Sequence, residues 1–474
     1  MSNDLDDKAT RSIGELVDAY KTKKLSPVDV VKQQLQRIDK FGQSINAFVY
    51  VVPDKALASA RESEARYAAG RPIGPLDGVT FSAKDGLSVT GYPSRRGSKA
   101  TPDTPATVTS PTVERCLAAG GIYIGSTTMP EFGIGPLTTS PLTGTTYNPW
   151  DVTKHAGGSS GGAAAAVAAG FNTFSLGTDA GGSNRIPAAM TGTVGYKGSG
   201  GRVPAFPPSG AGGLSCPGPI AGSVRDVAKI MNVIAKYDPR DVNALPSEDV
   251  DYESELSKDI KGLRVAYSAT LGFAKLVHPE IEKAARAAAL RLRDLGATIQ
   301  DANPEIEDPV GWYVSLMQAG NQYTLRKLTE VQKEVLSPNI RRLVDGPPVA
   351  IQSYLEAQER ARALTQAMVK FHERFDILVT PAVAAPAFDA SRVCPPEYDQ
   401  FENKRAWCPF VSLFNLTQQP AISIPIGLTG GLPIGLQLAA PRFGDALLMR
   451  VAHALEQKLG FREKPQLNEI AVRR

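Results

Sequence analysis

The chain has 474 residues, of which 42% are hydrophobic and 21% charged, and this is enough to bury a large core. A formal net charge of +4 with no basic tract argues against a nucleic-acid partner. The four cysteines lack CxxC spacing, so the sequence predicts neither a zinc site nor a disulfide framework.

The N-terminal stretch MSNDLDDKATRS is polar and acidic, unlike a signal peptide. No apolar run reaches the length needed to span a membrane. We therefore expect a cytoplasmic protein without a membrane partner.

Helices are expected over residues 12–40, as two segments, and over residues 53–69. Ser12 and Glu15 have the spacing of a capping box, and Ser26 precedes a proline at the start of the second helix. This second helix carries an apolar stripe made of Val28, Val31, Leu35 and Ile38. The stripe is predicted to face either the core or another protomer.

The segment GVTFSAKDG at residues 78–86 predicts a short apolar strand that ends at Lys84. A strand that enters a core does not normally end on an ammonium group unless that group has a partner or is neutral. Lys84 is therefore a candidate base.

Residues 157–202 contain two glycine-flanked serines, Ser159 and Ser183, which stand 24 residues apart. A small-sided helix is expected over residues 163–169 and a strand over residues 171–177, after which TDAGGS turns sharply. One helix and one strand between the serines can bring both hydroxyls to one place. Ser183 then lies near a helix N-terminus, where free backbone N–H groups gather.

These motifs admit other interpretations. Each motif taken singly is most often only a tight turn or a buried helix. A phosphate-binding loop is a second interpretation, but the GxxxxGK[ST] pattern of such loops is missing. GGSSG also matches the GxSxG nucleophile elbow, but the preceding NPWDVTKHA lacks a strand's apolar run, so no strand is expected there. Among the histidines, His155 lies close to the serines in sequence and stays open as an alternative base.

Several motifs in a fixed order closely resemble the amidase signature family, the Ser-cisSer-Lys hydrolases. They are GPLDGVTFSAKD, GSTTMPEFG, NPWD, the serine-containing stretch above, LSCPGPIAGSVRD and NLTQQPAISIPIGLTGGLPIGLQLAAPRFGD. The resemblance covers most of the chain. It implies an α/β fold in which a large twisted mixed β-sheet core is flanked by helices on both faces.

The resemblance also implies roles for individual residues. Lys84 corresponds to the family's lysine, Ser159 to the bridging serine that follows a cis peptide bond, and Ser183 to the acyl-forming nucleophile. The implied oxyanion hole consists of the backbone N–H groups of Ala180, Gly181, Gly182 and Ser183. Asp179 and Arg185 match family positions and are expected to brace the turn.

Residues 1–474 are expected to form a single amidase domain, with the signature core at 75–235. A variable, mostly helical segment at 240–400 is expected to shape the substrate pocket. Candidate pocket residues are Met129, Phe132, Ser160 and Trp407. No metal or cofactor is expected.

The implied activity is hydrolysis of a linear carboxylic amide, with ester hydrolysis as a side activity. Free lysine has a pKa of about 10.4, so a base near neutrality needs a pKa lower by about 3, or about 4 kcal/mol, which burial can supply. Neutral Lys84 would take a proton from Ser159, which takes one from Ser183 as it attacks the carbonyl carbon.

The main alternative is the A subunit of a tRNA-dependent amidotransferase, which would use glutamine as an amide. Ile186 stands here where the common pattern of that subunit has glutamine, as in stand-alone amidases. A non-catalytic binding protein would not be expected to keep all three reactive side chains. The predicted partner is a small-molecule amide, and a homodimer stays open.

Overall fold

The computed structural model describes residues 10–469. Residues 1–9, which supply most of the acidic N-terminal stretch that argues against a signal peptide, lie outside this range. Within the described range, no helix combines the length and the apolar character needed to cross a membrane.

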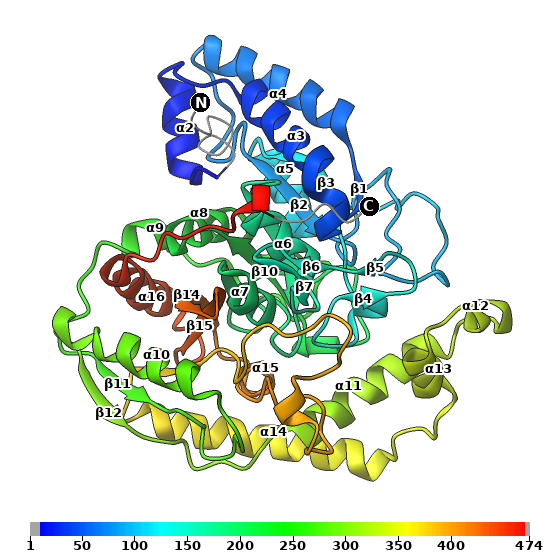
Figure 1. Ribbon diagram of the computed structural model, residues 1–474, viewed down its shortest axis with the longest axis vertical. Coiled ribbons are helices and arrows are strands. Elements are labelled where there is room, and N and C mark those ends of the chain that lie inside the picture. The colour runs from blue at the N-terminus through cyan, green and yellow to red at the C-terminus, as the bar shows by residue number, and fades with distance from the viewer. Residues whose placement is uncertain (1–9, 470–474) are drawn as a thin grey trace.

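An eleven-stranded mixed sheet forms the centre of the protein (Figure 1), in the order β1-β3-β2-β8-β10-β9-β14-β15-β13-β11-β12. The strands are β1 Phe48–Val51, β2 Thr80–Lys84, β3 Ile122–Thr127, β8 Phe174–Asp179, β9 Val194–Lys197, β10 Cys216–Ala221, β11 Arg264–Tyr267, β12 Thr298–Asp301, β13 Ile377–Pro381, β14 Ala421–Thr429 and β15 Leu432–Ala439. Strand β2 runs parallel to β3 and β8, and β11 runs parallel to β12 and β13, whereas the other pairs are antiparallel. The predicted mixed sheet is confirmed.

Helices cover both faces of this sheet. They are α2 Ile13–Lys21, α3 Pro27–Ile45, α4 Pro53–Ala68, α5 Pro111–Ala118, α6 Gly161–Ala168, α7 Arg185–Thr191, α8 Val224–Ile234, α9 Tyr252–Glu255, α10 Pro279–Leu290, α11 Val310–Leu325, α12 Glu330–Glu334, α13 Pro338–Asp345, α14 Ile351–His372, α15 Leu413–Leu416 and α16 Asp445–Leu459. Because side chains alternate along a strand, Ile377 and Val379 of β13 enter the core beneath α8, α10 and α16, whereas Leu378 packs with α7 and α14. The sheet is therefore buried on both sides.

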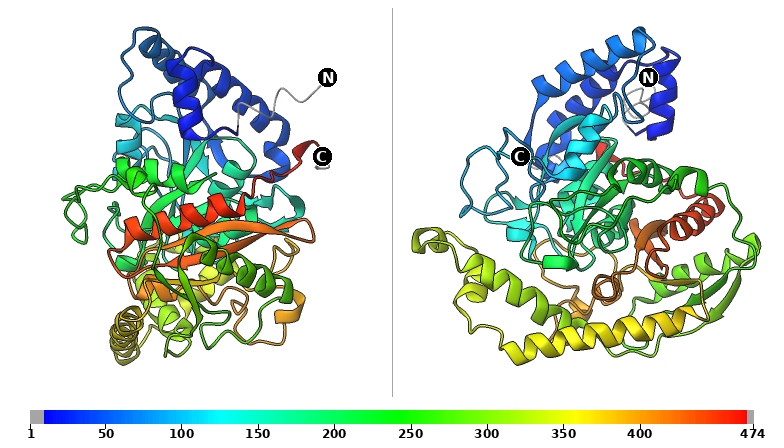
Figure 2. Two further views of the ribbon diagram at one scale, coloured as in Figure 1. Left: turned by 90° about the vertical axis from the view of Figure 1, so that its left-hand side faces the viewer. Right: turned by 180° about the vertical axis from the view of Figure 1, so that it is seen from behind.

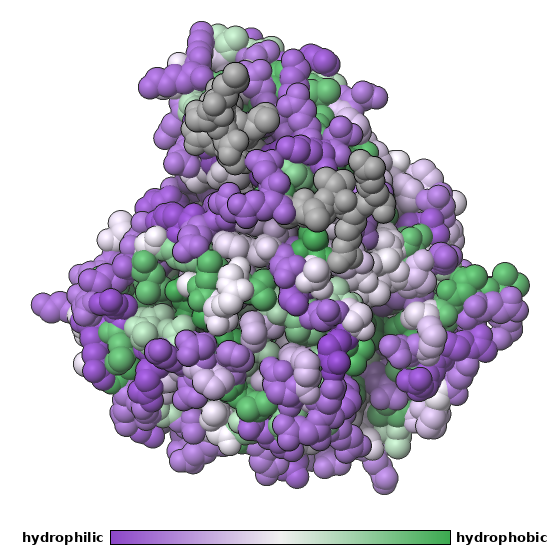
Figure 3. Space-filling model, in the orientation of Figure 1, coloured by the Kyte–Doolittle hydropathy of each residue, from purple (hydrophilic) through white to green (hydrophobic). Residues whose placement is uncertain are grey.

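The N-terminal helices α2–α4 lie at the opposite end of the molecule from α11–α14 (Figures 1 and 2). The predicted capping box at Ser12 is present. In α3, Val28 and Val31 pack against Ile122 and Ile124 of β3, so the apolar stripe faces the core. The face in Figure 3 is mostly hydrophilic, with hydrophobic residues gathered over α12 at its right-hand tip.

One local prediction is wrong. A strand, β7 (Asp151–His155), does precede the first serine, and it pairs with β6 (Tyr147–Asn148) in a two-stranded ribbon outside the main sheet. Only Val152 and His155 of β7 are buried, so this strand needs no apolar run. The strand also ends at His155, and residues 156–158 separate it from Ser159, so it does not run straight into the serine. A second ribbon pairs β4 (Thr139–Ser140) with β5 (Gly144–Thr145).

Candidate active site

Lys84 is the last residue of β2, next to the parallel strand β8. Because Ala83 lies opposite Leu176 in this pairing, the lysine side chain reaches the end of β8. Its Nζ donates to Thr178 Oγ1 at 3.0 Å and to Ser159 Oγ at 2.7 Å. The side chain is fully buried. The sheet therefore brings Lys84 to the first of the two serine loops.

The two serine loops are tied together through the backbone. Ser160 N donates to Ser183 O at 3.0 Å, so the turns that precede α6 and α7 lie against each other. Ser159 is buried and Ser183 is partly exposed, and both line the same cavity. The Gly158–Ser159 peptide bond is cis. One hydroxyl thus contacts Lys84, while the other opens to the cavity.

A buried ion pair holds the second serine loop in shape. Arg185 Nε and Nη2 each donate to the carboxylate of Asp179 at 2.9 Å, and Asn415 Nδ2 donates to the same group at 3.0 Å. Burial alone would raise the pKa of Asp179, but the charge and hydrogen bonds of Arg185 lower it overall. Asp179 therefore stays ionised and fixes the turn that carries Ser183.

The four predicted oxyanion donors divide into two kinds. Gly182 N already donates to Asp179 Oδ1 at 2.7 Å. Within residues 10–469, the N–H groups of Ala180, Gly181 and Ser183 donate to no protein acceptor. Three of the four predicted donors are thus free to bind a ligand oxygen, and Gly182 serves the turn instead.

The surroundings of Lys84 favour its neutral form. Burial lowers its pKa to about 7, the negative charge of Asp179 opposes this, and the positive charge of Arg96 adds to it. Among the described residues, no carboxylate forms an ion pair with Lys84, and its side-chain hydrogen bonds go to Ser159 and Thr178. An amine with this pKa can exchange a proton with a hydroxyl near neutral pH.

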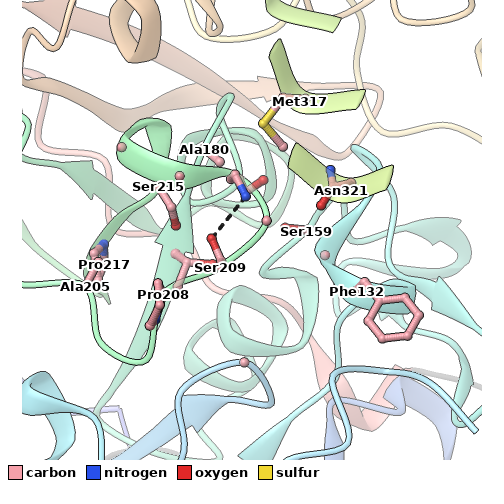
Figure 4. A pocket seen from close by; sticks show the side chains of 18 of the residues that line it. Phe132, Ser159, Ala180, Ala205, Pro208, Ser209, Ser215, Pro217, Met317 and Asn321 are labelled. Carbon is pink, nitrogen blue, oxygen red and sulfur yellow. Dashed lines mark hydrogen bonds between the residues drawn. The ribbon is translucent and has the colours of Figure 1, made fainter. Parts of the chain in front are cut away.

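The serines open into a cavity of about 420 Å³. Figure 4 shows Ser159 between Phe132 on one side and a loop with Pro208 and Ser209 on the other, with Met317 of α11 above. Met129 also lines the cavity and is largely buried. Two of the four predicted pocket residues, Met129 and Phe132, therefore line the cavity, and their contact with substrate stays a prediction.

The other two do not line the cavity. Trp407 is fully buried and packs edge-on against Phe388, because the loop that carries it folds into the core. Ser160 is also fully buried, and its hydroxyl donates to Asn184 Oδ1 at 3.1 Å. Ser160 thus links the two serine loops rather than forming a wall.

His155, the alternative base, points elsewhere. Its Nε2 lies 2.8 Å from the carbonyl oxygen of Arg392, and its ring packs on Phe388. Burial lowers its pKa. It does not line the serine cavity.

Much of the cavity wall was not predicted from the sequence. A loop over residues 201–213 and the helix α11 form one side, and the guanidinium-bearing residues Arg96 and Arg405 also face the cavity. Tyr313 of α11 packs so closely on Gly181 that a side chain there would collide with its hydroxyl. The density of glycine and proline in the loop is a usable signal, since such loops often carry binding residues.

A model of the family described as Amidase matches residues 29–449. The chain belongs to the amidase signature family. No group of histidine, cysteine and carboxylate side chains across residues 10–469 is arranged to hold a metal ion.

Curated relatives of this chain include the A subunit of the Glutamyl-tRNA(Gln) amidotransferase of Chloroflexus aurantiacus, which is 33% identical over 459 residues, covering 91% of this chain and 93% of the relative. The corresponding protein of Methanosarcina barkeri, which has the same name, is 32% identical over 470 residues, covering 94% and 96%. The chain is thus similar along most of its length to proteins named as amidotransferase subunits.

Solved structures give a second comparison. A bacterial aryl acylamidase of the amidase signature family superposes with a TM-score of 0.87 at 29% identity, covering 95% of this chain and 96% of that one. A 6-aminohexanoate cyclic dimer hydrolase has a TM-score of 0.87 at 26% identity, covering 97% and 99%. These structures share the fold, and their names describe an aryl acylamidase and a hydrolase of a cyclic dimer.

Proposed function

We propose that this protein is an amidase that hydrolyses a linear carboxylic amide through an acyl-enzyme on Ser183. Lys84 is the base, Ser159 carries protons between Lys84 and the nucleophile, and the N–H groups of Ala180, Gly181 and Ser183 hold the oxyanion. The observation that carries the proposal is the 2.7 Å hydrogen bond between Lys84 Nζ and Ser159 Oγ, in a buried setting that favours a neutral amine.

In the first half of the reaction, Ser183 Oγ attacks the carbonyl carbon and loses its proton to Ser159 Oγ, which passes its own proton to Lys84 Nζ. When the tetrahedral intermediate collapses, the carbon–nitrogen bond breaks and Ser159 returns a proton to the leaving nitrogen. The second half repeats these transfers with water as the nucleophile and frees the acid. An ester would follow the same route as a side reaction.

The wall of the cavity supports an amide with an apolar part. Aliphatic and aromatic side chains from several separate segments line it, including Phe132, Val203, Phe206 and Met317. We propose that segment 240–400 shapes this pocket, since α11 contributes Tyr313, Met317 and Asn321. Trp407, which is buried in the core, has no part in it.

The second candidate is the A subunit of an amidotransferase. The curated relatives favour it over the free-standing amidase, because the proteins from Chloroflexus aurantiacus and Methanosarcina barkeri both carry that name. Two features of this chain favour the free-standing form. Ile186 follows Arg185, and Asp241, the carboxylate that lines the cavity, already accepts N–H groups from Ala205 and Asn243, so it is poorly placed to hold the ammonium group of glutamine.

The two candidates are separated by one set of measurements. The purified protein is screened against aliphatic, aryl and amino-acid amides, with Ser183→Ala as the blank. Hydrolysis by the isolated chain supports the amidase. Glutaminase activity that appears only with a co-purifying partner supports the amidotransferase instead. No Ser183-dependent hydrolysis under either condition contradicts both.

A further inference from the structure

The charges on the cavity wall are unbalanced. The charged side chains that line it are Arg96, Arg240, Asp241 and Arg405. Arg240 is neutralised by ion pairs with Asp238 and Glu114. Asp241 accepts two backbone N–H groups. The remaining guanidiniums, Arg96 and Arg405, form no ion pair with any carboxylate among residues 10–469.

Of these two, Arg405 has partial compensation, because its guanidinium lies over the ring of Tyr313 at 5.3 Å. No aromatic ring among the described residues lies under the Arg96 guanidinium in this way. Its Nε is buried without a hydrogen-bond partner, and no side-chain hydrogen bond from its guanidinium is formed within the described part of the chain. Arg96 is half-buried, and a guanidinium with a buried Nε that has no acceptor is costly, so it is a ready site for an anion.

The backbone holds Arg96 firmly in this position. Asp85, the residue after Lys84, accepts the N–H of Arg95 on one oxygen and that of Gly97 on the other, both at 2.9 Å. The carbonyl of Arg96 accepts the N–H of Phe132 at 2.8 Å. Arg96 itself has a φ of 52°, a left-handed conformation that residues other than glycine seldom adopt. The carboxylate of Asp85 therefore accepts hydrogen bonds from the backbone and forms no ion pair with Arg96. Its negative charge still raises the pKa of Arg96, although burial lowers that pKa overall.

We propose that Arg96 binds an anionic group of the substrate, so that the preferred amides carry a carboxylate. This inference deepens the proposed amidase function and rests on it. A guanidinium matches a carboxylate through two parallel N–H···O hydrogen bonds, which fix orientation as well as adding affinity.

The kinetic test uses pairs of amides matched in size. In one pair the acyl part differs, with the mono-4-nitroanilide of glutaric acid against pentanoyl-4-nitroanilide. In the other the leaving group differs, with N-pentanoyl-4-aminobenzoate against pentanoylanilide. In at least one pair, kcat/KM is expected to favour the anionic amide by about 10- to 100-fold, the factor of one charge-assisted hydrogen bond.

Arg96→Gln is expected to bring that ratio close to one, and Arg96→Lys to give an intermediate value. The matched control is Arg95→Gln, since Arg95 is adjacent in the chain but does not line the cavity; it should keep the wild-type ratio. A ratio is used because loss of the Arg96 charge also raises the pKa of Lys84 and changes both rates alike. The inference is overturned if the wild-type kcat/KM ratio of anionic to neutral amide is near one in both pairs. It is also overturned if a preference for the anionic amide persists unchanged in Arg96→Gln.

Binding is measured separately from turnover, so that the two proposals fail in different ways. Calorimetry of glutarate on the Ser183→Ala protein should show binding that Arg96→Gln abolishes in the same background. Binding without hydrolysis of any amide would leave Arg96 as an anion site and contradict the amidase function. Hydrolysis without glutarate binding, and without a preference for anionic amides, would support the amidase function and contradict the anion site at Arg96.

Discussion

The ends of strands β2 and β9 offer a close comparison, because each places a fully buried lysine in the centre of the sheet. Lys84 ends β2 and Lys197 ends β9, and burial lowers the pKa of both. Lys84 Nζ donates to the hydroxyls of Ser159 and Thr178, whereas Lys197 Nζ donates to the carbonyl of Gly198 at 2.7 Å.

The difference teaches that burial alone does not make a base. A carbonyl oxygen cannot give a proton to an amine, but a hydroxyl can. Lys84 also connects through Ser159 to the cavity, while Lys197 does not line it. In the proposed mechanism, the role of each lysine is therefore set by what its amine contacts and not by its pKa alone.

The largest effect expected from this comparison comes from replacing each lysine by methionine. Lys84→Met should lower kcat/KM by about 10³-fold or more, because the proton acceptor for Ser159 is lost. Lys197→Met should leave kcat/KM within about 10-fold of the wild type. Steady-state kinetics on folded protein, checked by circular dichroism, measure both. Equal losses of kcat/KM in the two variants would contradict the distinction between Lys84 as a base and Lys197 as a structural residue.

A second variant removes the hydroxyl and keeps the amine. Ser159→Ala leaves Lys84 buried but without the hydroxyl that we propose carries protons between Lys84 and Ser183, so kcat is expected to fall by about 10²- to 10⁴-fold while KM changes little. Ser160→Ala is the neighbouring control, since the Ser160 hydroxyl bonds to Thr178 and Asn184 and not to Lys84. A larger loss at Ser160 than at Ser159 would show that the assignment of the two serines is reversed.

Much of this arrangement could be predicted from the sequence. The apolar run before Lys84 predicted β2, the alanine run predicted α6, and the glycines around both serines predicted tight turns, because these are local signals. The order of motifs also predicted the family.

The parts that failed depend on long-range packing. The burial of Trp407 follows from its contact with Phe388 and the surrounding core, which no local pattern reports. The use of Gly182 N by Asp179 depends on the shape of a single turn. Arg96 and α11 reach the cavity from distant parts of the chain, so their convergence is a property of the fold.

A smaller effect is expected from loosening the turn that carries Ser183. Asp179→Asn leaves the buried Arg185 charge uncompensated and should lower the free energy of unfolding by about 3–5 kcal/mol, measured by urea denaturation. It also removes the negative charge that raises the pKa of Lys84, so the acidic limb of the activity profile should move to lower pH. Asp301→Asn, at an exposed ion pair with Arg286, should change neither the free energy of unfolding nor the position of the acidic limb. A shift of the limb to higher pH would contradict the assigned electrostatics.

The smallest effect is expected from a change in the cavity wall at Phe132. Phe132→Ala should raise KM for bulky apolar amides by about 3- to 10-fold and leave kcat nearly unchanged, because Phe132 lines the cavity wall and has no part in the proposed proton transfers. Trp407→Phe is the comparison, since it should alter stability more than KM. A change in kcat alone at Phe132 would contradict its role in the wall.

The central claim is that neutral Lys84 draws the proton of Ser183 through Ser159. The most direct test measures the rate at which a fluorophosphonate labels Ser183, from about pH 5 to 9, with the site identified by peptide mass spectrometry. Below the Lys84 pKa of about 7 the amine is protonated, so the rate should rise about tenfold per pH unit and level off above it. In Lys84→Met the rate should be low and independent of pH. A wild-type rate that is flat across this range, or a Lys84→Met profile that matches the wild type, would contradict the account.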